Sequence, residues 1–270
     1  MNGEKAPYGV VSYDGVDLYH GECLAVMDEL IQRGVKVDAI ITDPPYGTTA
    51  CKWDSVIPFD AMWERLNQLI KPNGAIVLFG SEPFSSALRM SNIKNYKYDW
   101  VWEKEKGSNF ALSNKQPLRK TENISVFYSN QPYYDSCGEK LETPYRHTLP
   151  ISKSDSSKGA GEHNLNVDGS RKYAYYTHSK KHNLLYFPRE SQTKSNHPTQ
   201  KPVALMEYLI KTYTNDDELV LDFTMGSGTT CVAAYNTGRK CIGVEMDDKY
   251  FEVAKQRVSD AINTKAAQLF

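Results

Sequence analysis

Strand-like runs alternate with helix-like stretches along most of this chain of 270 residues. Apolar and β-branched runs of the kind found in buried strands occupy residues 35–42, 75–79, 98–102, 124–128, 219–223 and 240–245. Apolar residues recur at helical spacing in residues 23–33, 60–70, 202–213, 229–237 and 248–260. Strands that alternate with helices imply βαβ units, so we expect an α/β fold with a doubly wound, mainly parallel sheet.

The N-terminal part predicts a β-hairpin that precedes the alternating pattern. Residues 10–13 and 16–19 are strand-like, and Asp14 and Gly15 between them are a two-residue turn signal.

Residues 129–200 break the pattern. The segment is rich in Ser, Asn, Lys, His and Tyr, shows no amphipathic period and is too long for an ordinary connection within a domain. Its tyrosine content exceeds that of typical disordered tracts, so disorder is the less favoured reading. We expect a functional insertion with little regular structure.

Composition argues against membrane, disulfide and metal-dependent classes. The chain has no run of eighteen apolar residues and no secretory signal pattern at its start, so we expect a cytoplasmic protein without a membrane partner. Its five cysteines are widely spaced and lack a C-x-x-C pair, which favours reduced thiols. His178 and His182 have H-x-x-x-H spacing but no cysteine pair upstream, so we expect no metal site.

Charge is distributed unevenly although the net charge is only −1. Lysine and arginine outnumber the acids between Lys94 and Lys211, and acids are in excess elsewhere. This excess is either a footprint for phosphates or a solvated basic loop region, and charge alone leaves both readings open.

An acid, two prolines and a tyrosine follow the strand-like run 35–42 directly, as Asp43, Pro44, Pro45 and Tyr46. Ligands of open α/β sheets bind at the carboxyl ends of the strands, where this tetrapeptide is expected. Consecutive prolines remove two backbone donors and stiffen the chain, so an acid, bare carbonyls and an aromatic ring are held together. The alternative is a rigid turn with a surface tyrosine.

A second motif joins the strand-like run 219–223 to the helix-like stretch 229–237 through a loop that contains Gly226 and Gly228. The glycines allow the backbone to turn and to approach a ligand closely. Glu245, at the end of the next strand, is placed to accept two ribose hydroxyls. The hydroxyls expected to face a carboxylate, beside the amides of the helix N-terminus, are those of Ser227, Thr229 and Thr230.

This glycine loop fits the common nucleotide cofactors poorly. Cys231 replaces the third glycine of the dinucleotide fingerprint, and no G-K-[ST] follows, which argues against NAD and ATP.

Together, D-P-P-Y after one strand and D-F-x-x-G-S-G-T after another resemble the amino-methyltransferases of DNA, which act on adenine N6 or cytosine N4. The D-P-P-Y block comes first, as in the permuted arrangement called the β class. The resemblance implies S-adenosylmethionine as cofactor, double-stranded DNA as partner, a possible homodimer and a seven-stranded sheet of the methyltransferase type. It also implies a catalytic half at 1–128, a target-recognition insertion at 129–196 and a cofactor-binding half at 197–270.

Two further segments acquire roles through the resemblance. Residues 197–202 look like the family's H-P-T-Q-K-P stretch near the methionine end of the cofactor, and Gly21-Glu22-Cys23 looks like its G-D-C, with Glu22 in place of the usual aspartate. The cofactor-binding residues expected are Glu22, Cys23, Asp43, His197, Thr199, Gln200, Lys201, Asp222, Phe223, Gly226, Ser227, Gly228, Thr229, Thr230, Glu245 and Met246.

The expected chemistry is direct methyl transfer to an exocyclic amine that donates hydrogen bonds to the Asp43 carboxylate and the Pro44 carbonyl. The target base must leave the duplex, and Tyr46 is the expected stacking platform. The expected DNA-binding residues are Lys104, Lys106, Lys115, Arg119 and Lys120.

Because the family tends to use Asp in D-P-P-Y for adenine and Ser for cytosine, Asp43 favours adenine N6. Cytosine N4 stays open, as do an RNA or protein substrate and a non-catalytic nucleic-acid-binding module.

Overall fold

The computed structural model describes residues 9–48, 54–108, 110, 113–149, 166–168, 171–188 and 200–267. The chain divides into two compact units. The first joins Met1–Tyr133 to Leu184–Phe270, and the second is Tyr134–Asn183.

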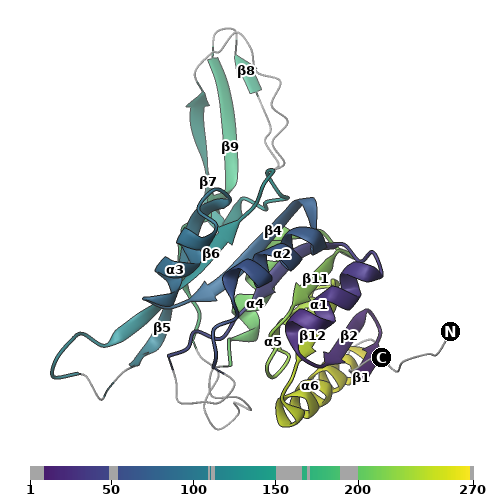
Figure 1. Ribbon diagram of the computed structural model, residues 1–270. Coiled ribbons are helices and arrows are strands. Elements are labelled where there is room, and N and C mark those ends of the chain that lie inside the picture. The colour runs from purple at the N-terminus through teal and green to yellow at the C-terminus, as the bar shows by residue number, and fades with distance from the viewer. Residues whose placement is uncertain are drawn as a thin grey trace. The chain divides into compact units, whose positions relative to one another are not determined.

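A nine-stranded sheet forms the centre of the first unit (Figure 1). Its strands in spatial order are Gly9–Tyr13 (β1), Val16–His20 (β2), Lys240–Glu245 (β12), Leu219–Asp222 (β11), Val37–Thr42 (β3), Ile70–Gly80 (β4), Arg119–Phe127 (β6), Tyr96–Ser108 (β5) and Leu184–Tyr186 (β10). The five adjacent strands β2, β12, β11, β3 and β4 run parallel to one another. Strand β6 is antiparallel to both of its neighbours, β4 and β5. The predicted mainly parallel α/β sheet is confirmed.

The sheet has more strands than the seven predicted. Strand β1 lies outside β2 at one edge of the sheet, and β10 lies outside β5 at the other. Strand β1 completes the predicted hairpin with β2 and is antiparallel to it. Strand β10 pairs in parallel with β5 and was not predicted. It has three residues in a polar segment, of which Leu185 alone is buried, so no alternating pattern marks it.

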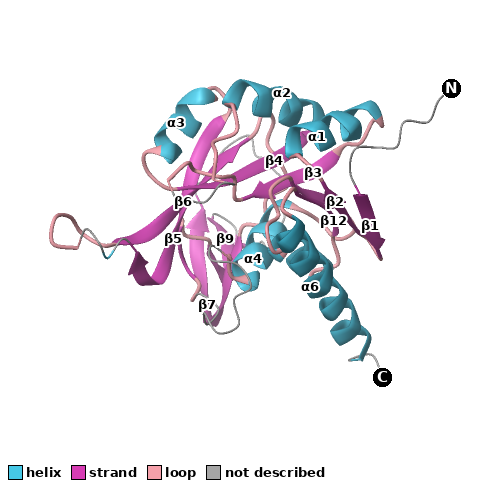
Figure 2. Ribbon diagram, turned by 60° about the horizontal axis from the view of Figure 1, so that its bottom comes forward, coloured by secondary structure: helices cyan, strands magenta, loops and turns pink. Residues whose placement is uncertain are grey.

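Within the described residues, six helices cover the two faces of the sheet. They are Cys23–Gln32 (α1), Phe59–Leu69 (α2), Phe84–Ser91 (α3), Val203–Tyr213 (α4), Thr229–Asn236 (α5) and Asp248–Ala267 (α6). Figure 2 shows α1, α2 and α3 on one face and α4 and α6 on the other, and α5 packs against both α4 and α6. None of the described helices combines the length and the apolar character needed to cross a membrane.

Helix α2 shows how the sequence pattern produces the core. Met62, Trp63, Leu66 and Leu69 recur at spacings of three and four, so they lie on one face of the helix, and all four are buried. They join the cluster that includes Ile40, Ile76 and Phe127 from the sheet. Helix α3 was not predicted, because its eight residues include several serines and only a short apolar stripe.

The second unit contains a three-stranded antiparallel sheet of order β7-β9-β8. Its strands are Cys137–Leu149 (β7), Asn166–Asp168 (β8) and Arg171–Lys180 (β9). The expectation of little regular structure in this region was therefore wrong. Pairing satisfies the backbone whatever the side chains are, and the tyrosine-rich sequence of β9 suits a strand.

Candidate active site

A cavity of about 410 Å³ opens where β3, β11 and β12 end, within the first unit. Of the residues predicted from the sequence, those that line it are Glu22, Cys23, Asp43, Pro44, Pro45, Tyr46, Gln200, Lys201, Asp222, Phe223, Gly226, Ser227, Thr229, Thr230, Glu245 and Met246. Both sequence motifs thus open onto one cavity, as expected for parallel strands whose carboxyl ends share an edge. His197 and Thr199 lie outside the described residues.

Hydrogen bonds tie the two motifs together at the bottom of this cavity. Strands β3 and β11 are parallel neighbours, and the Thr42 hydroxyl at the end of β3 donates to Asp222 Oδ1 of β11 at 2.5 Å. The Thr224 hydroxyl contacts that of Thr42 at 2.7 Å and donates to the Asp43 carbonyl at 3.2 Å. The position of Asp43 is therefore fixed from the strand that carries the glycine loop.

The Asp222 carboxylate connects the end of β3, the glycine loop and α5. The residue is 3% exposed, and it accepts hydrogen bonds from the hydroxyls of Thr42 and Thr230 and from the amide of Thr224. Burial raises the pKa of its carboxyl to about 6 in spite of these donors. The Thr230 hydroxyl, expected to face a ligand carboxylate, is directed to Asp222 instead.

The Asp43 carboxylate has two protein partners. The Tyr46 hydroxyl donates to Oδ1, and the Lys201 ammonium donates to Oδ2. Burial raises the pKa of the Asp43 carboxyl, and the nearby Lys201 charge opposes that rise. The Tyr46 ring packs against Phe84 with ring centroids 5.0 Å apart, and burial followed by the Asp43 charge raises its pKa.

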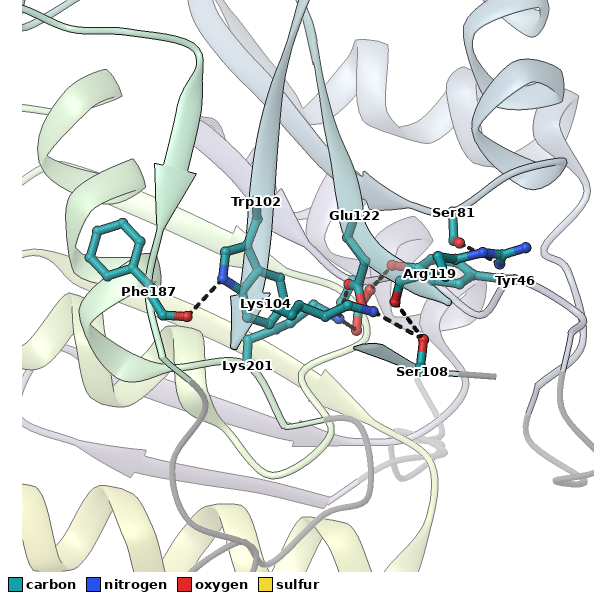
Figure 3. Close-up of polar contacts among 10 residues, drawn as sticks. Tyr46, Ser81, Trp102, Lys104, Ser108, Arg119, Glu122, Phe187 and Lys201 are labelled. Carbon is teal, nitrogen blue, oxygen red and sulfur yellow. Dashed lines mark hydrogen bonds and ion pairs between the residues drawn. The ribbon is translucent and has the colours of Figure 1, made fainter. Parts of the chain in front are cut away.

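Lys201 also contacts Glu122, which was not among the site residues predicted from the sequence. Its ammonium lies 3.2 Å from Glu122 Oε2, and Glu122 Oε1 lies 3.1 Å from the ammonium of Lys104 (Figure 3). Glu122 is 8% exposed and lies in β6, two residues before the buried Ile124–Phe127 run. An acid this close to Ile124, Val126 and Phe127 was the available sequence signal.

Lys104 departs from the expected phosphate contacts. It is 2% exposed, because its side chain points inward from β5 to Glu122 and to the Ser108 hydroxyl. It therefore belongs to the polar interior rather than to a DNA-facing surface. The other expected cations are exposed, namely Lys106, Lys115, Arg119 and Lys120.

The glycine loop is held by Glu245. Gly226 has a φ of 53°, a conformation that suits glycine, and its amide donates to Glu245 Oε2 at 3.0 Å. The amide of Asp247 donates to Oε1 at 2.8 Å. Burial raises the pKa of the Glu245 carboxyl to about 7, and these amides limit the rise.

Arg257 of α6 supports the same loop from the outside and was not predicted. Its Nη1 lies 2.7 Å from the Ser227 carbonyl and 2.9 Å from the hydroxyl oxygens of Ser227 and Thr229. The Ser227 hydroxyl also contacts Gln200 Oε1 at 3.3 Å. The hydroxyl oxygens of Ser227 and Thr229 thus accept hydrogen bonds from the Arg257 guanidinium. The sequence suggested only a ligand carboxylate as their partner.

Gly228 does not line the cavity, although it was expected to approach a ligand. It caps α5 with a φ of 76°, and a Cβ there would lie 2.9 Å from the Cβ of Ala254. Helix packing, not ligand contact, excludes a side chain at this position.

Glu22 lines the cavity and forms the N-terminal cap of α1. Its carboxylate accepts from the amides of Leu24 and Ala25 at 3.0 and 2.9 Å. The Cys23 thiol donates to the same carboxylate at 3.3 Å, and burial together with the Glu22 charge raises its pKa. The departure from aspartate therefore keeps an acid whose oxygens face the cavity edge.

Asp54 is another lining acid that the sequence did not reveal. Its carboxylate accepts from the amides of Gly47 and Thr48 at 2.8 and 2.9 Å, and the residue is 9% exposed. It thereby fixes the chain directly after Tyr46.

Known proteins share this arrangement. A family model described as DNA methylase matches residues 37–256. The chain belongs to the DNA methylase family. This DNA methylase is 25% identical over 258 residues to the type II methyltransferase M1.MboII of Moraxella bovis, covering 88% of this chain and 94% of that relative. It is 26% identical over 268 residues to the DNA adenine methyltransferase YhdJ of Escherichia coli (strain K12), covering 93% and 85%.

Solved structures agree with that family. The DNA methylase superposes on the M1.HpyAVI-SAM complex with a TM-score of 0.61 at 27% identity, covering 90% of this chain and 98% of that one. The cytosine-N4-specific PvuII DNA methyltransferase shares the fold, with a TM-score of 0.64 at 17% identity and 93% of each chain covered.

Proposed function

We propose that this DNA methylase transfers a methyl group from S-adenosylmethionine to the N6 amine of an adenine at specific sites in double-stranded DNA. The observation that carries the proposal is the shared cavity, in which Asp43 and Tyr46 face the same space as Gly226 of the glycine loop and Glu245. The name of the relative YhdJ, an adenine methyltransferase, supports the choice of adenine over cytosine.

The residues that line the cavity suit S-adenosylmethionine. Glu245 is an acceptor for ribose hydroxyls, and Phe223 and Met246 offer apolar contact. Glu22 also lines the cavity, next to Gly21, whose amide donates to the Glu245 carbonyl. The N-terminus of α5 and the Gly226 loop bring backbone amides to the same cavity. When bound, the cofactor supplies a methyl carbon on a positively charged sulfur, which a positioned nitrogen can take by direct displacement.

Asp43 and Pro44 would make the amine a better nucleophile. Hydrogen bonds from the two N–H groups to the carboxylate and to the Pro44 carbonyl stabilise the positive charge that grows on the nitrogen. A carboxylate offers about four lone-pair sites, so Asp43 retains acceptor capacity beside Tyr46 and Lys201. Correct positioning of the two reactants is worth roughly 7 to 11 kcal/mol in well-oriented systems.

The target adenine must be rotated out of the helix, which costs a few kcal/mol. Tyr46 provides a ring on which the base stacks, worth roughly 1 to 3 kcal/mol. Exposed Lys106, Lys115, Arg119 and Lys120 would contact phosphates. We assign sequence recognition to the insertion 129–196, with catalytic and cofactor-binding halves at 1–128 and 197–270. The homodimer stays a prediction, to be checked by analytical ultracentrifugation.

The test is product analysis. The protein is incubated with double-stranded DNA and methyl-labelled S-adenosylmethionine, and the nucleosides are separated and weighed by mass spectrometry. N6-methyladenine is the expected product. N4-methylcytosine would replace the base assignment, and tight DNA binding without any product would favour a non-catalytic module.

Asp43→Ala provides the matched test of the site. We expect transfer to fall by at least about 100-fold, with cofactor affinity measured by calorimetry largely retained. Asp60→Ala, which removes an exposed acid in the first turn of α2, is the control. Equal activity of the two variants would remove Asp43 from the reaction.

A further inference from the structure

Four charged side chains of alternating sign form a continuous row that ends at Asp43. From the interior outward they are Lys104, Glu122, Lys201 and Asp43. The two lysines and Glu122 are each at most 8% exposed. The row connects β5, β6, the segment before α4 and the end of β3, which are far apart in sequence. Figure 3 shows Lys104, Glu122 and Lys201 of this row.

Burying four ionised groups is unfavourable unless each charge has a partner of opposite sign. In this row each charge does, because two cations alternate with two anions. Removing one member would leave its neighbour as an uncompensated buried charge. Lys201 lies between two carboxylates, and its ammonium is also 5.1 Å from the centre of the Phe79 ring. A lysine ammonium is a compact charge on a flexible stem, so its place depends on these partners.

We propose that Lys201 and Glu122 are positioning residues for the proposed methyl transfer. Lys201 fixes the orientation of the Asp43 carboxylate and favours its ionised form against the effect of burial, and Glu122, anchored by Lys104, holds Lys201 in place. The inference rests on the proposed function, because it concerns the charge state of the proposed amine acceptor. A neutral Asp43 would have lost acceptor capacity at the atoms that face the amine.

The titration behaviour of the row agrees with this geometry. Burial would raise the pKa of the Glu122 carboxyl, but Lys201 and Lys104 lower it to about 2. Burial lowers the pKa of the Lys201 ammonium, and Asp43 and Glu122 together more than reverse that effect. The charged or titratable groups that act on Asp43 are Lys201, Glu122, Tyr46 and Asp222.

The experiment compares pH profiles of kcat/KM for methyl transfer in the full-length protein. The acidic limb is the part of the profile in which kcat/KM falls as the pH falls and Asp43 becomes protonated. In Lys201→Met, Asp43 faces Glu122 with no cation between them, so this limb should move to higher pH by at least about one unit. Below the limb, that shift lowers the ionised fraction of Asp43 about tenfold. Lys201→Arg keeps the charge and should retain the wild-type limb. An acidic limb that stays in place in Lys201→Met would overturn the proposal.

A double variant separates charge balance from simple loss of a side chain. Lys201→Met combined with Glu122→Gln removes one cation and one anion. The acidic limb should therefore return toward the wild-type position, and kcat/KM at pH values below the limb should recover about tenfold over Lys201→Met. A double variant as shifted as the single one would show that Glu122 does not act through charge.

Lys104→Met keeps the proposal testable if Lys201→Met does not fold. It removes the anchor of Glu122 without touching Asp43, so the acidic limb should shift in the same direction by a smaller amount, and no shift would contradict the anchoring role. The control is Lys97→Met, the same change at an exposed lysine of β5, which should leave the limb in place.

Thermal unfolding and cofactor calorimetry on each variant distinguish loss of fold from loss of positioning. If wild-type protein gives no methylated base, the proposed function fails. If wild-type protein is active and the limbs coincide, the positioning proposal alone fails.

Discussion

Gly228 packs directly against Ala254: a Cβ atom added at Gly228 would lie only 2.9 Å from the Cβ of Ala254. Gly228→Ala should therefore lower stability in two ways, through its φ of 76° and through crowding between α5 and α6. We expect a loss of roughly 2 to 4 kcal/mol in the free energy of unfolding, measured by urea denaturation.

Gly238→Ala isolates the backbone contribution to that loss. Gly238 has a φ of 73° but nothing within 4 Å of a Cβ, so this variant should lose only about 1 to 2 kcal/mol. Equal losses in the two variants would show that contact with Ala254 is unimportant.

Cofactor affinity should depend on pH through Glu245. Because the pKa of this acid is raised to about 7, it is ionised above that pH and increasingly neutral below it. A carboxylate accepts ribose hydroxyls better than a carboxylic acid, so we expect tighter S-adenosylmethionine binding at pH 8 than at pH 6. Calorimetry across that range measures the trend.

Glu245→Gln is the matching variant for this trend. It should bind more weakly overall and lose the part of the pH dependence that belongs to the protein. An unchanged slope in the variant would assign the pH dependence to another group.

Arg257 should matter for cofactor binding although it lies outside the cavity. Arg257→Ala removes the guanidinium from the Ser227 carbonyl and the Thr229 hydroxyl, and loss of such charged hydrogen bonds costs about 1.5 to 3 kcal/mol. We expect the Kd for S-adenosylmethionine to rise at least about tenfold. Lys255→Ala, at a residue of α6 paired with Glu252, should bind like wild type.

Salt dependence should separate the exposed lysines from the buried one. If Lys115 contacts a phosphate, Lys115→Ala should reduce the slope of log K for DNA binding against log salt by about 0.9. Lys104→Ala should leave the slope unchanged, because Lys104 faces Glu122 in the interior. A reduced slope in Lys104→Ala would place that lysine at the DNA surface instead.

Much of the fold was predictable because local patterns decide it. The run Val37–Thr42 and the helix face of Met62 and Leu66 carry their burial in their spacing. Helix α3 and strand β10 were missed because each is short and depends on neighbours for its stability. The sheet of β7, β8 and β9 was missed because its strands are polar and lack an apolar face that sequence alone would reveal.

The site divides in the same way. Asp43, Tyr46 and the Gly226 loop were found because each belongs to a contiguous motif next to a strand end. The contact between Lys201 and Asp43 spans 158 positions, and the inward direction of Lys104 is a tertiary effect that charge counts cannot predict. Arg257 is one of several charged residues of α6, so nothing in the local sequence marked its contact with the glycine loop.

Strands β6 and β10 both pair with β5. The chain therefore leaves the main sheet after β6 and returns to it on the other side of β5, with residues 134–183 in between. A segment attached in this manner is exchangeable. Its length and sequence can diverge in evolution, or be replaced by grafting from a relative, while the strands that carry Asp43 and Gly226 keep their order. On the proposed function, new sequence preferences can then arise without any change in the chemistry.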